Sequence, residues 1–203
     1  MEKMETDRKR ELRKKFLALR AAYSRAEHEA LDAAICRNLG GLPAYRESSA
    51  VAIYASDGNE PDLFALAAGS PEKRFFLPRY VAAEKRYELV EVRDFATELV
   101  RAKYGLLEPR PELPAADPEF VAREMFFVTP AVACDRAGVR LGRGGGFYDR
   151  LLCGVCRPAA AAAVYDCCLS REALPREMHD HPVDFVVTER EICNVRKQDW
   201  GNR

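Results

Sequence analysis

The sequence predicts an α/β fold, a three-layer sandwich around a mainly parallel, Rossmann-like sheet with a helical hairpin at the N-terminus. Short apolar runs alternate along the chain with segments of helical periodicity, which is typical of strands joined by helical crossovers. The run at residues 125–129 is almost continuously apolar, as expected of a parallel strand buried on both faces. A chain of 203 residues fits one domain, so we assign residues 1–203 to a single unit.

The first forty residues predict two helices. Residues 7–22 place apolar side chains at helical spacing among basic ones. Ser24 and Glu27 form a capping box, which begins a second helix that ends at the Gly40–Gly41 pair. The basic run at residues 8–15 is compatible with phosphate or nucleic-acid contacts, but such a run is more often a solvated helix face.

Beyond these helices the hydrophobic period becomes that of strands. Strands are predicted at residues 49–54, 74–77, 87–92, 125–129, 158–165 and 184–188. Helices are predicted at residues 63–68 and 147–156. Pro78 is expected to end the second strand, and four prolines within residues 104–118 predict an extended loop. In a parallel sheet of this kind ligands bind beyond the carboxyl ends of strands, so the segments after Tyr54, Leu77 and Thr129 are candidates for a site.

Composition and charge exclude several classes of protein. The 32 basic and 32 acidic residues cancel, so no overall field attracts nucleic acid or an anionic membrane. The longest apolar run, residues 159–165, is far shorter than the roughly 20 residues of a membrane span, and the charged N-terminus lacks the apolar core of a secretion signal. Seven cysteines, an odd number, are expected to be free thiols, which favours a cytoplasmic protein.

The most informative stretch is residues 135–150, where four glycines fall within five residues between arginines. Glycine lets a backbone approach a ligand closely, and successive N–H groups in such a loop form an anion site, best where a helix follows. Arginine donates to phosphate oxygens, and Asp149 offers hard oxygen ligands to a metal that accompanies a nucleotide. The two common phosphate-loop patterns are absent, since no Lys-Ser/Thr follows and Phe147 replaces a final glycine. The glycine cluster by itself is compatible with a phosphate cradle and with a flexible turn.

Other constellations are weaker. Cys153-x-x-Cys156, combined with the later cysteines or histidines, suggests zinc, but its spacing matches no common zinc finger and buried thiols are favoured. No serine or cysteine stands in a pattern with histidine that favours nucleophilic catalysis. Asp180 lies in a polar segment before the last predicted strand and is able to share a metal with Asp149.

Several segments occur in the same order as in one known family. They are Lys9–Arg13, Asn59–Glu60, Leu77–Tyr80, Tyr104–Pro109, Pro130–Asp135, Arg140–Asp149 and His179–Asp180. Along almost its whole length the chain resembles the 5-formyltetrahydrofolate cyclo-ligases, also called 5,10-methenyltetrahydrofolate synthetases. The glycine motif that ends in Tyr148-Asp149 is the most specific of these segments.

The resemblance implies an enzyme that uses ATP and Mg²⁺ to convert 5-formyltetrahydrofolate into 5,10-methenyltetrahydrofolate, with release of ADP and phosphate. The formyl oxygen would attack the γ-phosphoryl group to give an N5-iminium phosphate, and N10 would then displace phosphate. Phosphoryl transfer depends mainly on positioning and charge stabilisation, which agrees with the missing nucleophile–base pair. The expected partner is therefore a small folate, without nucleic acid or membrane, and a monomer is expected.

The same resemblance implies the residues of the site. Lys9 and Arg13 would bind the ATP phosphates. The nucleotide would also contact Arg140, Leu141, Gly142, Arg143, Gly144, Gly145, Gly146, Phe147 and Tyr148, of which Arg140, Arg143 and Tyr148 would act at the reacting centre. The folate would contact Ala55, Glu60, Tyr104, Arg143, Gly144, Gly145, Gly146 and Phe147. Asp149 and Asp180 would hold Mg²⁺.

The chain also departs from the family pattern. Ala131, Cys134 and Phe147 stand where the family usually has glycine, an apolar aromatic residue and tyrosine, and residues 166–168 replace a segment in which glutamine is common. These changes touch the pocket walls more than the phosphate cradle. A non-catalytic homologue that binds a nucleotide or RNA, or that is regulatory, is the alternative function, and a sugar-phosphate isomerase is a more distant one.

Overall fold

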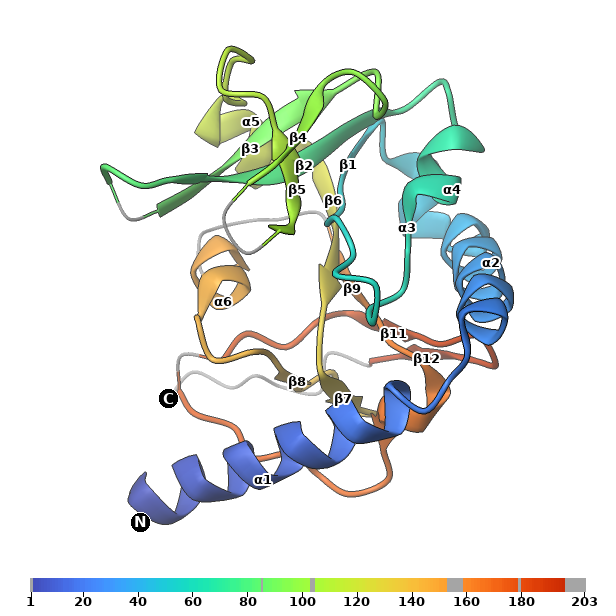
Figure 1. The fold of residues 1–203 in the computed structure, drawn as a ribbon, viewed down its shortest axis with the longest axis vertical. Coiled ribbons are helices and arrows are strands. Elements are labelled where there is room, and N and C mark those ends of the chain that lie inside the picture. The colour runs from blue at the N-terminus through green and yellow to red at the C-terminus, as the bar shows by residue number, and fades with distance from the viewer. Residues whose placement is uncertain (1, 85, 103–104, 153–158, 179, 196–203) are drawn as a thin grey trace.

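A computed structural model describes residues 2–84, 86–102, 105–152, 159–178 and 180–195. Its centre is a seven-stranded sheet with the strand order β12-β11-β9-β6-β1-β2-β3 (Figure 1). The strands are β1 (Ala50–Ala52), β2 (Arg74–Val81), β3 (Arg86–Val92), β6 (Met125–Pro130), β9 (Ala160–Ala163), β11 (Phe185–Val187) and β12 (Ile192–Asn194). The five inner strands, β11, β9, β6, β1 and β2, run parallel to one another. Each edge strand, β3 or β12, runs antiparallel to its neighbour. The predicted mainly parallel sheet is confirmed.

Helices cover both faces of this sheet, which confirms the three layers. One apolar core joins the sheet to α2 (Arg25–Gly41), α3 (Pro43–Glu47) and α4 (Phe64–Ala68). The opposite core joins it to α1 (Glu2–Arg20), α5 (Pro118–Glu124) and α6 (Phe147–Leu152). The strand period explains this division, because alternate side chains such as Phe126 and Phe127 of β6 point into opposite cores.

The two N-terminal helices follow each other as predicted. The Ser24 hydroxyl accepts a hydrogen bond from Glu27 N at 3.3 Å, and the Glu27 carboxylate accepts one from Ser24 N at 2.7 Å, so the capping box is formed. From this turn the helices diverge, with α2 against the sheet and α1 across the lower end of the molecule (Figure 1). Within the described residues, no helix combines the length and the apolar character of a membrane span.

The order of the strands creates a switch point. From β1 the chain first adds β2 on one side and later adds β6, β9 and β11 on the other side. The gap beyond the carboxyl ends of β1 and β6 is therefore the place where an open α/β sheet binds ligands. Tyr54 and Ala55 follow β1, and Ala131 follows β6, at this edge of the sheet.

The structure adds short elements that the sequence did not predict. The segment 104–118 is not wholly loop, because β5 (Leu107–Pro109) pairs with β4 (Leu99–Arg101). A small second sheet joins β7 (Ala133–Asp135), β8 (Arg140–Leu141) and β10 (Leu169–Ser170), the last preceded by the 3-10 turn η2 (Asp166–Cys168). Strands of two or three residues carry too little periodicity to be recognised. The helix predicted at 147–156 is described as far as Leu152.

Pro78 does not end its strand, so that prediction was wrong. β2 continues to Val81, with Pro78 opposite Leu89 of β3. Phe76 O accepts from Ile53 N, so the backbone nitrogens of alternate residues 76, 78 and 80 face the β1 side. β1 stops at Ala52, and Pro78 therefore forfeits no ladder hydrogen bond. Tyr80 N instead donates to the Glu108 carboxylate at 3.1 Å.

The turn between β7 and β8 sets the direction in which the chain enters the glycine-rich stretch. One oxygen of the buried Asp135 carboxylate accepts from Ala137 N and Val139 N, at 2.9 and 3.0 Å, and the other accepts from Leu174 N at 2.9 Å. Gly138 closes this turn with φ +79°, and a Cβ there would lie 2.5 Å from Val183 O. Only glycine fits both the backbone conformation and this contact.

We expect Gly138→Ala to lower the free energy of unfolding by about 3 kcal/mol or more, because left-handed strain and steric overlap add. Gly58→Ala is a matched control, since Gly58 has φ +87° but nothing within 4 Å of a Cβ. The control should lose only about 1–2 kcal/mol. Urea titrations followed by circular dichroism measure both, and equal losses would contradict the role of the Val183 contact.

Candidate active site

A cavity of ≈ 270 Å³ lies at the switch point of the sheet. It is lined by residues at the ends of β1 and β6, by the middle of β2, and by every residue of the glycine loop (residues 142–146) except Gly144. The structure thus brings together the three segments expected to hold ligands, those after Tyr54, Leu77 and Thr129. The predicted site residues on its wall are Ala55, Glu60, Arg140, Gly142, Arg143, Gly145, Gly146, Phe147, Tyr148 and Asp149.

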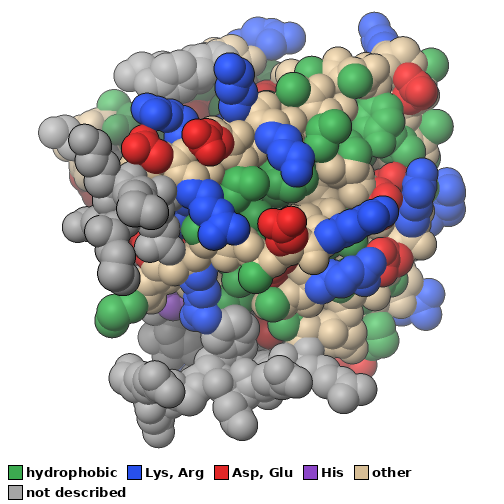
Figure 2. Space-filling model, turned by 90° about the horizontal axis from the view of Figure 1, so that it is seen from below, with side chains coloured by type: hydrophobic (Ala, Val, Ile, Leu, Met, Phe, Trp, Pro, Cys, Tyr) green, Lys and Arg blue, Asp and Glu red, His purple; other side chains and the backbone are tan. Residues whose placement is uncertain are grey.

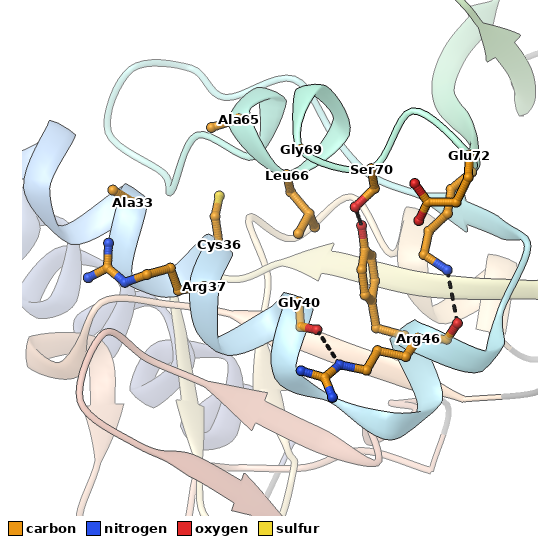
Figure 3. Close-up of a pocket in the computed structure, with 12 residues that line it drawn as sticks. Ala33, Cys36, Arg37, Gly40, Arg46, Ala65, Leu66, Gly69, Ser70 and Glu72 are labelled. Atoms are coloured by element: carbon orange, nitrogen blue, oxygen red, sulfur yellow. Dashed lines mark hydrogen bonds between the residues drawn. The ribbon is translucent and has the colours of Figure 1, made fainter.

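The remaining predicted residues divide into three groups. Lys9, Arg13 and Asp180 contact one another or the glycine loop beside the cavity, and Leu141 and Gly144 belong to the same stretch of chain without lining it. Tyr104 and His179 lie outside the described residues. A separate hollow of ≈ 550 Å³ between α2, α3 and α4 contains none of the predicted residues (Figure 3), so the switch-point cavity is the candidate site.

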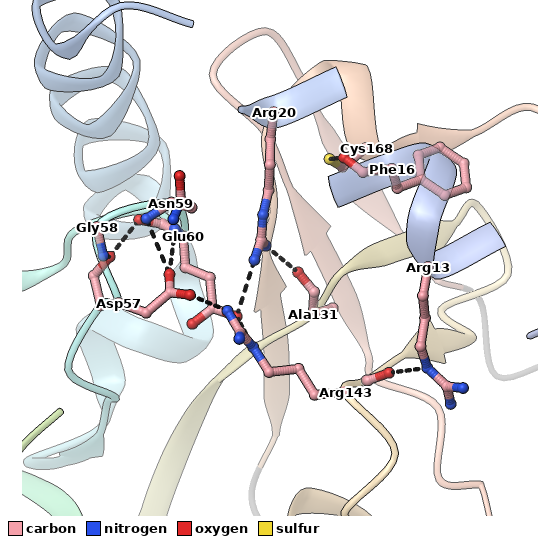
Figure 4. Close-up of polar contacts among 12 residues, drawn as sticks. Arg13, Phe16, Arg20, Asp57, Gly58, Asn59, Glu60, Ala131, Arg143 and Cys168 are labelled. Carbon is pink, nitrogen blue, oxygen red and sulfur yellow. Dashed lines mark hydrogen bonds and ion pairs between the residues drawn. The ribbon is translucent and has the colours of Figure 1, made fainter. Parts of the chain in front are cut away.

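Lys9 and Arg13 lie on the face of α1 that is turned toward the site. Lys9 is buried, and its Nζ lies 2.8 Å from Asp180 Oδ2 and 3.0 Å from Glu177 Oε1. Burial alone would lower the pKa of Lys9, but these two carboxylates outweigh it and raise the pKa above the ordinary value. Arg13 Nε donates to Gly142 O at 2.8 Å, so its guanidinium lies against the glycine loop (Figure 4).

Arg20 is a site residue that the sequence analysis missed. Its side chain is 2% exposed, Nη1 donates to Ala131 O at 3.4 Å, and Nη2 lies 3.6 Å from Glu60 Oε1 (Figure 4). Within the described part of the chain, Nε and Nη2 have no hydrogen-bond partner. Arg20 is seven residues beyond Arg13, two helical turns along the same face of α1. That spacing was the signal that could have found it.

Glu60 is the acid at the centre of these cations. Arg143 Nε lies 3.3 Å from Glu60 Oε1, and Arg143 Nη2 also contacts the carboxylate of Asp57. Burial is the main influence on Glu60 and raises its pKa, although Arg143 and Arg20 oppose it. Burial also acts to raise the pKa of Asp57, but the Asn59 N–H and Arg143 prevail and lower it. The two acids therefore ionise differently in one small site.

Arg140 and Asp149 form a second ion pair on the other side of the glycine loop. Arg140 Nη2 lies 2.8 Å from Asp149 Oδ1, and the Arg140 guanidinium lies 6.0 Å from the centre of the Tyr148 ring. Arg140 Nε and the Tyr54 hydroxyl are buried without a hydrogen-bond partner among the described residues. Burial also raises the pKa of the Tyr148 hydroxyl, which stays protonated at neutral pH. The wall thus offers donors that a ligand is able to use.

The two expected metal ligands are brought near each other. Asp149 Oδ1 accepts from His181 N at 3.3 Å, so the residue after Asp180 touches the Asp149 carboxylate. Among the described residues, no three acidic, histidine or cysteine side chains converge as a metal cluster. Mg²⁺ is commonly held by one or two carboxylates together with substrate phosphates and water. The hard oxygens of Asp149 and Asp180 therefore fit Mg²⁺ better than a metal that needs a complete protein cage.

The glycine loop supplies backbone rather than side chains at this edge. Gly144 and Gly146 adopt φ +98° and +62°, the left-handed region that side chains disfavour. A loop with this geometry and flanking arginines binds anions through its N–H groups. The fold and the site together define an α/β protein with a cleft beyond its central strands that arginines and a glycine loop line.

Comparison with known proteins identifies the family. The chain belongs to the 5-formyltetrahydrofolate cyclo-ligase family, whose model matches residues 5–189. The 5-formyltetrahydrofolate cyclo-ligase of Mycolicibacterium smegmatis is 35% identical over 185 residues, which cover 89% of this chain and 93% of that protein. The Escherichia coli K12 protein of the same name is 39% identical over 100 residues, covering 47% of this chain and 52% of its own length. The resemblance seen in the sequence is confirmed.

Solved structures agree with this assignment. The NMR structure of Aquifex aeolicus 5,10-methenyltetrahydrofolate synthetase matches with a TM-score of 0.80 and 34% identity, over 96% of both chains. A 5,10-methenyltetrahydrofolate synthetase from Mycoplasma pneumoniae matches with a TM-score of 0.67 over 89% of this chain and 98% of its own. At 21% identity the latter supports the fold alone.

Glu60→Gln tests the electrostatics of the cavity. The pKa of Glu60 is raised in the folded protein, so its ionisation favours the unfolded chain as pH rises through the ordinary glutamate value near 4.5. The stability of the wild type relative to Glu60→Gln should therefore fall as the pH rises above about 4.5. Urea unfolding of both proteins across this range measures it, and a relative gain for the wild type would contradict the burial argument.

Proposed function

We propose that this chain converts 5-formyltetrahydrofolate into 5,10-methenyltetrahydrofolate in a reaction that requires ATP and Mg²⁺ and releases ADP and phosphate. The observation that carries the proposal is the convergence of Lys9 and Arg13 from α1 with Arg140 and Arg143 around one glycine loop. Family membership supplies the class of substrate, and this set of cations fits a triphosphate. A soluble monomer of the cytoplasm is the setting that we propose for it.

The phosphate side of the site is formed by α1 and the glycine loop. Arg13 is fixed to the loop through Gly142 O, and Lys9 is held beside it by Asp180. Both cations are thus positioned before a ligand arrives, which reduces the entropy cost of binding. Phosphate oxygens are acceptors for these donors and for the loop N–H groups.

The metal side is formed by Asp149 and Asp180. Their carboxylates are paired with Arg140 and Lys9, the same cations that face the proposed phosphate position. Mg²⁺, when bound there, would neutralise phosphate charge. Arg140 and Lys9 would in turn be available to donate to phosphate oxygens. The charges of the site therefore suit a nucleotide that arrives with its cation.

The folate side is formed by the residues that follow β1, by the middle of β2 and by aromatic rings. The pterin carries N–H groups, and the buried Glu60 carboxylate is the acidic acceptor that faces the cavity beside Ala55. Phe147 and Tyr87 lie 4.3 Å apart between ring centres on the same wall, and Tyr148 adjoins Phe147. A flat heteroaromatic ring fits such walls. Arg20, though not in contact with the cavity, would hold Glu60 in place.

The chemistry requires positioning more than covalent help. The formyl oxygen attacks the γ-phosphorus, the bond to the ADP oxygen breaks, and an iminium phosphate forms at N5. N10 then attacks that carbon, phosphate leaves with the former formyl oxygen, and the N10 proton is released. Arg140 and Arg143 stabilise the charge on the transferred phosphoryl group. Tyr148, which remains a neutral phenol, donates at the same centre without removing a proton.

The surface weighs against the RNA-binding alternative. On the face where α1 lies, Lys and Arg side chains are interspersed with Asp and Glu rather than gathered in one basic stripe (Figure 2). Lys9 and Arg13 of the basic run are directed to acidic and backbone partners of the site. An RNA-binding face would present such residues to solvent.

The direct test is the absorbance band of 5,10-methenyltetrahydrofolate, followed with purified protein, 5-formyltetrahydrofolate, ATP and Mg²⁺. We expect the band to grow only when both ATP and Mg²⁺ are present, with one ADP released per product. Growth of the band without ATP would contradict the phosphorylated intermediate. Failure to form product while calorimetry shows nucleotide binding would favour the non-catalytic alternative.

Lys9→Ala tests the phosphate side. Loss of one charge-assisted donor should lower kcat/KM for ATP by roughly tenfold to hundredfold. Arg10→Ala is the matched control on the same helix, because the Arg10 side chain is 78% exposed and pairs with Asp7. The control should keep wild-type kinetics. Equal losses in the two variants, or an effect on folate KM alone, would refute the assignment of Lys9.

A further inference from the structure

Two adjacent cysteines outside the cavity form a thiol pair that the proposed reaction does not use. Cys167 Sγ and Cys168 Sγ lie 3.8 Å apart in η2, at the exit of the central strand β9. Both are free thiols, as are the other described cysteines, Cys36, Cys134 and Cys193. Neither sulfur lines the switch-point cavity.

The two thiols differ in access. Cys168 is 1% exposed and its sulfur lies 3.7 Å from Phe16 O of α1 (Figure 4). Cys167 is partly exposed and lines an open hollow of ≈ 560 Å³ together with Arg136, Arg171 and Arg190. A small reagent from solvent therefore reaches Cys167 first, with Cys168 directly behind it.

The two thiols also differ in ionisation. The hydrogen-bonding contacts of Cys167 with the Cys168 thiol and with the Tyr23 hydroxyl lower the pKa of Cys167 to about 7, against burial and the nearby carboxylates of Glu189 and Asp166. The same pairing and burial raise the pKa of Cys168. The exposed sulfur is thus the nucleophilic thiolate, and the buried sulfur keeps its proton.

We propose that Cys167 is an oxidation site for small hydroperoxides and that Cys168 is its resolving thiol. The Cys167 thiolate attacks the distal peroxide oxygen, the O–O bond breaks, and the released alkoxide or hydroxide takes up a proton. This two-electron oxidation leaves a sulfenic acid on Cys167. The Cys168 sulfur then attacks the sulfenic sulfur, water leaves with the thiol proton, and a Cys167–Cys168 disulfide remains.

The bond would change the local backbone. Consecutive Cα atoms are about 3.8 Å apart across a trans peptide, whereas disulfide-linked residues usually have Cα atoms about 4.4–6.8 Å apart. Closing a ring between neighbours therefore requires η2 to rearrange. Cys168 would also lose the S–H donor that contacts Phe16 O, on the helix that carries Lys9 and Arg13. Oxidation at η2 is thus mechanically connected to α1.

The test is peptide mass mapping after stoichiometric hydrogen peroxide, which needs no turnover and so is independent of the proposed function. In the wild type the peptide with Cys167 and Cys168 should lose two hydrogen atoms before any other cysteine reacts, and dithiothreitol should reverse this. Cys168→Ser should instead trap a sulfenic acid at Cys167, detected with dimedone. Cys36→Ser, a matched control at a buried thiol far along the chain, should behave as the wild type.

Three results would overturn the proposal. One is first oxidation at another cysteine of the wild type, and a second is irreversible oxidation of Cys167 with Cys168 intact. The third is disulfide formation only after urea has unfolded the protein. Because the wild-type map decides the matter by itself, a variant that folds poorly would not obscure the outcome.

Discussion

The burial of cationic side chains along one face of α1 is the constraint on which the site depends. Lys9 and Arg20 are buried and Arg13 is half-buried, and their partners are Asp180, Glu60 and a loop carbonyl, respectively. An uncompensated buried charge would cost several kcal/mol. Positions of α1 that separate these cations from their partners are therefore disfavoured. Two of these contacts join segments more than 100 positions apart, Lys9 to Asp180 and Arg13 to Gly142. The ligand-binding edge is therefore assembled by tertiary electrostatics as much as by the sheet.

The glycine-rich stretch is held to that edge by a separate device. Asp135 binds the backbone on both sides of its turn, and Gly138 packs so closely on Val183 that no side chain is tolerated. The turn therefore fixes where β8 and Arg140 emerge. The left-handed Gly146 that follows then lies with its backbone on the wall of the cavity. Asp135 and Gly138 therefore position this motif, whereas its later residues line the cavity.

Much of this was accessible from the sequence, for physical reasons. Long apolar runs and caps identify the sheet and α2, because burial on both faces and end-capping leave strong periodic signals. The short strands β4, β5, β7 and β8 left no such periodic signal. Pro78 led to a wrong strand end, because β2 accommodates a proline there only since β1 stops at Ala52. The family resemblance named half of the described residues that line the cavity. The helical spacing from Arg13 places Arg20 on the same face of α1, but its partner Glu60 follows only from a tertiary contact, which no local pattern encodes.

The shortness of β1 has a consequence for how the cavity can vary. β1 ends at Ala52, while its neighbours continue to Val81 and Pro130. The missing length is a notch in the sheet, and the cavity occupies it with main chain on both shoulders. Point substitutions change the side chains that line such a notch. They do not change its depth between β2 and β6, which is set by the number of residues in β1. An insertion or deletion in β1 would therefore change the depth of this cavity between the flanking strands, which no substitution of a lining side chain can do.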